Sequence, residues 1–412
     1  MTSPTTSSSA SRSAWQALLR LLQRTECGLV AAIVAVVLLA AAVDTQHTYF
    51  TRPGDSAINV LRQTALLGIF ALGAAVVIIA GGIDLSSGSV IAFSGTVCGL
   101  VMLQLAPDQM KQGLPVGMPV MAAAIVATLV VGFLIGSLHS WLITMIGLPP
   151  FVATLATLVG LRSLGRALVA HYTGGSSQIQ IFDNQFRYLA TSVWVPVVLF
   201  VVLAALVWLL MARTVVGRHL YALGGNENAA RLSGIRTDGL KWLAYSLSAM
   251  LSAVAGILYI CEVATADPEK LGKGYELNAI AAAVVGGCSL TGGAGTIPGT
   301  VLGVLFLRVV IDGVAKIIKR SADIYEGLIV GIVVVVAVAF TQVRQTGGRG
   351  RRFFGGPLGI VTIVNLAVMA ALLATLFGED YHVDGKIVGA VALVVLILGR
   401  FFEGRSGAVK PP

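Results

Sequence analysis

Residues 193–211 read VWVPVVLFVVLAALVWLLM, an apolar stretch without a single charged side chain. A helix needs about 20 apolar residues to cross the roughly 30 Å of hydrocarbon in a bilayer. Similar stretches recur along the chain. A transmembrane β-barrel would instead show segments of about ten residues in which apolar and polar side chains alternate. The sequence therefore predicts an all-α integral membrane protein, folded as a polytopic helix bundle.

The composition agrees with this interpretation. Of the 412 residues, 56% are hydrophobic and only 11% are charged, and the mean hydropathy is +0.88. A soluble domain carries roughly 25% charged residues, so this chain lacks the charge to cover a soluble surface. An intrinsically disordered chain would contain few apolar residues. Both of these classes are excluded.

Twelve apolar segments have the character of membrane spans. They lie near residues 28–43, 58–80, 86–105, 119–141, 151–170, 193–211, 240–262, 276–293, 297–315, 324–341, 360–377 and 386–403. The segment at 276–293 is ambiguous, because its apolar part, 277–285, is short for a crossing. It is predicted to cross, with re-entry into the membrane as the alternative.

Basic residues cluster in the segments between the spans. Arginines are concentrated in the connectors 212–239 and 342–359, and both terminal tails are basic. Cytoplasmic segments carry an excess of Lys and Arg, and an even number of predicted spans separates these four segments. We therefore expect both termini to be cytoplasmic, although the cluster of Lys316, Lys319 and Arg320 then lies outside. The loops account for the net charge of +9, so no nucleic-acid partner is expected.

Two glycine-rich segments, GGIDLSSGS at 81–89 and GGCSLTGGAG at 286–295, interrupt the apolar pattern and echo one another. An ionised side chain in hydrocarbon costs at least about 2.5 kcal/mol, so Asp84 should face protein or water. It either caps the span that begins near residue 86 or lines a path. Close helix packing is the alternative for the glycines. The candidate path or packing residues are Gly81, Gly82, Asp84, Ser86, Gly88, Asn278, Gly286, Gly287, Ser289, Gly292 and Gly293.

The connector after the sixth span contains GRHLYALGGNENAARLSGI at 217–235. Asn226 is predicted to cap a short helix over 227–232, and Gly234 is predicted to end it. Such a helix is a rigid projection that another protein can bind, and the small side chains of Ala229 and Ala230 keep it narrow enough to fit a groove. A solvated helix without a partner is the alternative.

Two further polar regions have open interpretations. Arg162 and Arg166 are four residues apart on one face of the fifth predicted span, where they either pair with Asp84 or lie near an end. The loop 262–275 carries charges of both signs and is predicted to be an outer surface, which is either solvated or a docking site.

The sequence contains no recognisable catalytic group. His139 and His171 have no partner at the spacing of a catalytic triad or a metal site, and the four cysteines form no CxxC pair. No GxxxxGK[ST] sequence is present, so a P-loop ATPase is not predicted in this chain. We expect no catalytic residue and no metal ligand.

Four blocks of the sequence, in order, resemble the membrane permeases of ATP-binding-cassette (ABC) importers. The similarity is to the ribose/xylose-type monosaccharide group of the branched-chain amino acid/ribose permease superfamily. The blocks are GGIDLSSGSV at 81–90, PPFVATLATLVGLRSLGRAL at 149–168, GRHLYALGGNENAARLSGI at 217–235 and GYELNAIAAAVVGGCSLTGGAGTIPGTVLG at 274–303.

The resemblance implies a transport subunit, not an enzyme, in the bacterial inner membrane. It would form the path for a monosaccharide delivered by an extracytoplasmic sugar-binding protein. Cytoplasmic ATPase subunits would bind ATP-Mg, and this chain would bind no cofactor. A homodimer, or a pair of related permeases, would form one path. The block at 217–235 would couple to the ATPase, through Gly224, Gly225, Asn226, Glu227, Ala229, Ala230, Arg231, Ser233 and Gly234.

The resemblance also suggests how the chain is divided. A cytoplasmic, disordered tail at 1–27 would precede a ten-span permease core at 28–341. A basic cytoplasmic linker at 342–359, an additional two-helix hairpin at 360–403 and a cytoplasmic tail at 404–412 would follow. Ten spans are usual for the family, so the resemblance implies no role for the added hairpin.

The solute is not determined by these motifs. Permeases for nucleosides, autoinducer-2 and branched-chain amino acids share parts of the four blocks. An ion-coupled secondary transporter is a further alternative, but it should carry more ionisable residues within its spans, where Asp84 stands nearly alone.

Overall fold

The computed structural model describes residues 25–44, 51–317, 326–333, 335, 356–378 and 385–406. The chain divides into two compact units, residues 1–337 and 338–412. Most of the predicted N-terminal tail, most of the basic linker and the end of the C-terminal tail lie outside the described residues. The limits predicted for the tails, the linker and the hairpin therefore stay predictions.

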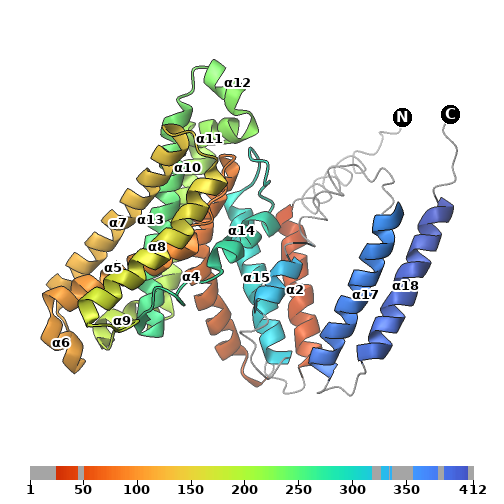
Figure 1. The fold of residues 1–412 in the computed structure, drawn as a ribbon, viewed down its shortest axis with the longest axis horizontal. Coiled ribbons are helices and arrows are strands. Elements are labelled where there is room, and N and C mark those ends of the chain that lie inside the picture. The colour runs from red at the N-terminus through yellow and green to blue at the C-terminus, as the bar shows by residue number, and fades with distance from the viewer. Residues whose placement is uncertain are drawn as a thin grey trace, which may run out of the picture. The chain divides into compact units, whose positions relative to one another are not determined.

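Helices make up nearly all of the described structure (Figure 1). The first unit contains α2 (Thr25–Val43), α4 (Pro53–Ile79), α5 (Ser87–Leu105), α6 (Pro107–Gln112), α7 (Met118–Thr144), α8 (Pro150–Thr173), β1 (Ile179–Gln180), α9 (Asn184–Thr191), α10 (Trp194–Arg213), α11 (Val215–Gly225), α12 (Glu227–Leu232), α13 (Thr237–Val263), β2 (Thr265–Ala266), α14 (Tyr275–Val285) and α15 (Ile297–Ile317). A further helix covers residues 326–333. In the second unit, α17 (Gly356–Gly378) and α18 (Gly385–Ser406) pack together.

Eight helices of the described structure are long and apolar enough to cross a membrane, which confirms the all-α polytopic fold. Three of them, α4, α5 and α13, form the centre of the first unit. In their most apolar windows 89%, 72% and 78% of the residues are buried, against 17–28% in α2, α7, α8 and α10. The outer helices are therefore apolar and exposed, as expected for helices that face lipid or another membrane protein.

Small residues allow the central helices to pack closely. A Cβ atom added to Gly136 of α7 would lie 2.6 Å from the backbone oxygen of Tyr245 in α13. One added to Gly73 of α4 would lie 2.7 Å from Cα of Ser248, also in α13. Contacts of this kind are typical of membrane helices, where packing and not the hydrophobic effect drives association.

The two ends of the first unit differ. The α12 end carries α11 and α12, and the opposite end carries α6 and α9 (Figure 1). At that opposite end β1 and β2 form a two-residue antiparallel pair, with Ile179 opposite Ala266. We refer to it as the β end.

The predicted span at 276–293 is only partly helical. The helix α14 ends at Val285, and at 1.5 Å per residue its 11 residues cover only about 16 Å. The remaining residues, 286–296, form a loop at the α12 end, where Gly293 N donates to the carbonyl oxygen of Ile79, 2.9 Å away. A single helical crossing at 276–293 is therefore excluded.

The missing half of the crossing comes from the loop that precedes α14. Ala266 packs against position 99 of α5, whereas Gly272 packs against position 88. The loop thus runs antiparallel to α5 for about 16 Å before α14 begins. The prediction that 262–275 is an outer surface is wrong for residues 266–268 and 271–272, which are buried, whereas Glu269, Lys270 and Lys273 are exposed. Residues 264–285 form one discontinuous crossing, half loop and half helix.

Candidate functional site

The short helix predicted after the sixth span is present. It covers Glu227–Leu232, and Asn226 is its cap, with Oδ1 accepting from the backbone N–H of Ala229 at 3.0 Å. Gly234 follows the helix with a φ of +82°, the left-handed conformation that ends many helices. These local predictions are confirmed because each of them depends only on residues within one helical turn.

The two alanines of α12 have different environments. Ala229 is exposed, but Ala230 is buried against the rest of the unit. Leu232, whose side chain is 90% exposed at the end of α12, was not among the predicted coupling residues. The sequence did contain a signal for this exposed position, because Leu232 is an apolar residue at the end of a short helix that is otherwise polar or small. The exposed surface of α12 is therefore formed by Asn228, Ala229, Arg231, Leu232 and Ser233.

Ion pairs tie α12 to the start of α13. Glu227 Oε1 lies 2.6 Å from Lys241 Nζ and 3.2 Å from an Arg231 guanidinium nitrogen. Arg231 also lies 3.9 Å from Asp238 of α13. Partly exposed pairs of this kind contribute little stability individually, but together they orient the short helix on the unit.

Asp84 is buried between α5 and α13. One carboxylate oxygen accepts from the backbone N–H and the hydroxyl of Ser86, at 2.9 and 2.5 Å, and the other accepts from the hydroxyl of Ser248 at 2.8 Å. It therefore fastens the turn before α5 to α13. Toward α5 its bonds reach only Ser86, the residue before the helix, and Ser86 makes no capping hydrogen bond, so the capping and path interpretations both stay predictions. The pairing of Arg162 with Asp84, left open above, is replaced by other contacts.

The remaining residues of the two glycine-rich segments lie in close backbone packing. A Cβ atom on Gly286 would lie 2.7 Å from Cα of Thr300 in α15, and one on Gly88 would overlap the carbonyl oxygen of Gly272. Asn278, in the first half of α14, donates to Glu326 Oε1 at 3.0 Å. Within the two segments the backbone adopts a positive φ at Gly81, Gly287, Gly292, Gly293 and Gly295. The hydroxyl of Ser289 is bonded to that of Thr291, and Gly82 packs against the Tyr245 hydroxyl.

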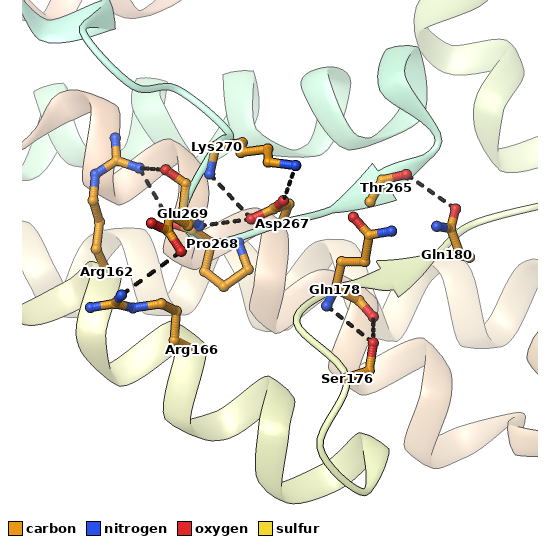
Figure 2. Close-up of polar contacts among 10 residues, drawn as sticks. All are labelled: Arg162, Arg166, Ser176, Gln178, Gln180, Thr265, Asp267, Pro268, Glu269 and Lys270. Carbon is orange, nitrogen blue, oxygen red and sulfur yellow. Dashed lines mark hydrogen bonds and ion pairs between the residues drawn. The ribbon is translucent and has the colours of Figure 1, made fainter.

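Arg162 binds the backbone of the loop that leads into α14 (Figure 2). Its guanidinium donates to four carbonyl oxygens, those of Pro268, Glu269, Leu271 and Gly272, at 3.2, 3.1, 3.1 and 3.0 Å. Arg162 is at the middle of α8, so the prediction that it lies near a helix end is wrong. It holds the loop half of the discontinuous crossing in place.

A small hollow lies beside this contact, on the exposed side of α8. It is lined by Leu158, Val159, Arg162, Ser163, Arg166, Glu269 and Lys273. Arg166 and Glu269 form an exposed ion pair at 3.8 Å across it (Figure 2). Arg166 lies about 7 Å along the axis from the midpoint of a 24-residue apolar helix. Charged groups at that depth belong in water or against protein, not in lipid.

The exposed faces of α7 and α10 differ from that of α8. Apart from Arg213, the last residue of α10, their exposed large side chains are apolar, among them Val126, Phe133, Val198, Val201 and Leu206. These helices therefore present the surface suited to lipid, whereas the hollow on α8 presents a polar surface at the same depth.

A protein family described as "Branched-chain amino acid transport system / permease component" matches residues 56–338. The chain belongs to this family. The match begins within α4 and ends where the second unit begins, so α2, α17 and α18 lie outside it. No solved structure matches the chain.

The alignments with curated relatives extend over most of each relative's length. It is 35% identical over 326 residues to the ribose import permease protein RbsC of Escherichia coli K12, covering 76% of this chain and 93% of that protein. It is 36% identical over 294 residues to RbsC of Bacillus subtilis 168, covering 70% and 85%. The autoinducer 2 import system permease protein LsrC of Photorhabdus luminescens is 30% identical over 317 residues, with 76% and 88% covered.

The family and the fold together define the class of molecule. The chain is the permease subunit of an ABC importer, a multi-pass inner-membrane protein whose role is transport and not catalysis. Such a subunit works with an ATPase and with a substrate-binding protein. The resemblance inferred from the four sequence blocks is thus confirmed.

Proposed function

We propose that this permease forms the path by which a ribose-type monosaccharide enters the cell. A sugar-binding protein delivers the solute at the β end, and an ATPase that binds ATP-Mg docks at the α12 end. The α12 end is then cytoplasmic, as are both termini. Ribose import permeases from three species are among its relatives, at 33–36% identity, which favours a sugar over autoinducer 2.

The observation that carries this proposal is the charged hollow on α8. Its polar groups, Ser163, Arg166, Glu269 and Lys273, can donate to and accept from sugar hydroxyls, while Leu158 and Val159 supply apolar contact. The hollow is open on one side. A second copy of the chain, facing the first across it, would close the path, and the homodimer is part of the proposal.

The energy for transport comes from the ATPase. ATP binding closes the two ATPase subunits, which move the α12 helices and tilt the spans so that the path opens to each side in turn. The ATPase can shift this equilibrium only if it binds the two conformations with different affinities. The permease itself supplies the path and the surface on which the ATPase acts.

Reconstitution tests the function directly. Proteoliposomes that hold the permease with its ATPase and its binding protein are expected to accumulate labelled D-ribose, and only with ATP. Omission of the ATPase serves as the control. Uphill uptake driven by an ion gradient without the ATPase would contradict the proposal, and uptake of a nucleoside or autoinducer 2 in place of ribose would reassign the solute.

Cysteine labelling tests the position of the path. Val159 in the hollow and Val201 on α10 are 59% and 58% exposed, and both lie close to the middle of their helices. In a Cys27→Ser background, Val159→Cys is expected to react with a charged, water-soluble methanethiosulfonate at least about tenfold faster than Val201→Cys, because only the hollow holds water. The other three cysteines are buried.

Two outcomes of the labelling would contradict this position. Equal rates for the two cysteines would show that the α8 face is no wetter than the lipid face. A disulfide that forms between two Val159→Cys copies, together with no labelling, would show that a dry contact between copies covers the hollow.

A further inference from the structure

Three backbone segments meet at the α12 end of the first unit. They are the end of α4 with its following turn, the end of α11, and the loop between α14 and α15. Their contact residues are Gly81, Gly224, Gly292 and Gly293, which we call the glycine junction, together with the carbonyl group of Ile79. Two of these segments are the glycine-rich sequences that echo one another, and the third leads directly into α12.

The glycine junction has no room for a side chain. A Cβ atom on Gly224 would overlap the carbonyl oxygen of Ile79 and would lie 2.6 Å from Gly293 N and 3.0 Å from Gly81 N. One on Gly292 would lie 2.6 Å from the carbonyl oxygen of Gly224. The hydrogen bond from Gly293 N to Ile79 O, at 2.9 Å, joins two of the segments directly. Backbone therefore packs on backbone, with no flexible side chain between.

The junction is also close to α12 along the chain. Only Gly225 separates Gly224 from Asn226, the cap of α12. A side-chain contact adds to this connection, because the Tyr221 hydroxyl of α11 donates to the carbonyl oxygen of Gly295 at 2.8 Å. Burial raises the pKa of the Tyr221 phenol above its ordinary value, so the group stays a protonated donor. A displacement of α12 therefore acts on the junction across a single intervening residue.

Beyond the junction the chain leads to four elements of the core. Gly81 follows the end of α4 and is three residues before Asp84, which bonds Ser248 of α13 and the turn before α5. Gly292 and Gly293 lie between α14, the helical half of the discontinuous crossing, and α15. The loop half of that crossing borders the hollow on α8.

We propose that the glycine junction carries the motion of α12 to the two glycine-rich segments, and that Gly224 is the positioning residue that makes this contact. The inference rests on the proposed function, because it takes α12 as the helix that the ATPase moves. Coupling of this kind depends on direct contact between the backbone segments. A larger side chain at position 224 would disrupt that contact, so that ATP hydrolysis continues while less solute is moved.

Gly224→Ala in the complete importer tests this role. The added methyl group displaces the junction but leaves the exposed surface of α12 unchanged. We expect the ATPase to co-purify as with the wild type, while the amount of solute moved per ATP hydrolysed falls about tenfold, within the range of coupling effects. Gly239→Ala at the start of α13 is the matched control, since an added Cβ there meets no atom within 4 Å. It is expected to keep the wild-type ratio.

A second variant covers the case in which Gly224→Ala does not fold. Tyr221→Phe removes only the hydrogen bond to Gly295, and we expect it to lower the ratio of solute to ATP about twofold or more. A wild-type ratio in a folded Gly224→Ala variant, or in Tyr221→Phe when the first variant fails, would overturn the inference. Failure of the ATPase to bind the wild-type permease would instead refute the proposed function, so the two failures are distinguishable.

Discussion

Leu232→Asp is expected to weaken binding of the ATPase to the permease about thirty-fold. Truncating a buried contact at the centre of an interface costs about 2 kcal/mol or more, and each 1.4 kcal/mol is a factor of ten in affinity. Leu232 is 90% exposed, so the substitution removes no contact within the permease, and the fold should lose less than about 0.5 kcal/mol. Co-purification and titration of the ATPase against permease in detergent measure the effect.

Leu114→Asp provides the matched control for this experiment. Leu114 is also exposed, but it follows α6 at the end of the unit opposite α12 (Figure 1). The same change of side chain there should leave the affinity for the ATPase unaltered. If Leu232→Asp binds the ATPase as tightly as the wild type does, α12 is not the docking surface. Ala230 is a poorer site for this test, because its buried position would confuse lost docking with a misplaced helix.

Arg162→Met is expected to destabilise the permease by about 3 kcal/mol and to abolish transport. The guanidinium satisfies four carbonyl oxygens of the loop before α14, and hydrogen bonds to charged groups contribute about 1.5–3 kcal/mol each. Some of these carbonyls reach water, which limits the loss. Arg162→Lys should recover little, because an ammonium group cannot span the carbonyls that a planar guanidinium contacts together.

Arg166→Met is the control for stability. Arg166 lies one turn further along α8 and forms an exposed ion pair with Glu269, so its removal should cost less than about 1 kcal/mol. Thermal unfolding of the purified variants, together with protease digestion within 267–274, separates the two arginines. Equal stability of the two variants would contradict the role of Arg162 as the anchor of the loop.

Several features of this permease were predictable because they depend on residues that are close in sequence. The cap at Asn226, the limits of α12 and the left-handed Gly234 follow from hydrogen bonds within one turn. The long apolar helices follow from composition alone, and eight helices in the described residues have the expected length. The sequence blocks that indicated a permease were likewise continuous.

The features that were predicted wrongly depend on contacts between distant parts of the chain. Arg162 and Pro268 are 106 positions apart, so no local pattern shows that the arginine binds a loop and not Asp84. The same contact draws the supposed outer loop 262–275 into the unit. The opposite environments of Ala230 and Leu232 also result from packing, because a six-residue helix shows no clear periodicity.

The amino-acid sequence by itself determined the all-α membrane fold, the family and the short capped helix, since hydropathy and capping act over a few residues. Only the tertiary structure decided how deep each polar group lies and which backbone segments touch. The glycine junction shows the difference: the glycines at 81, 224 and 292–293 are visible in the sequence, but their meeting is not. It arises because helices that pack through small residues bring distant backbone into direct contact.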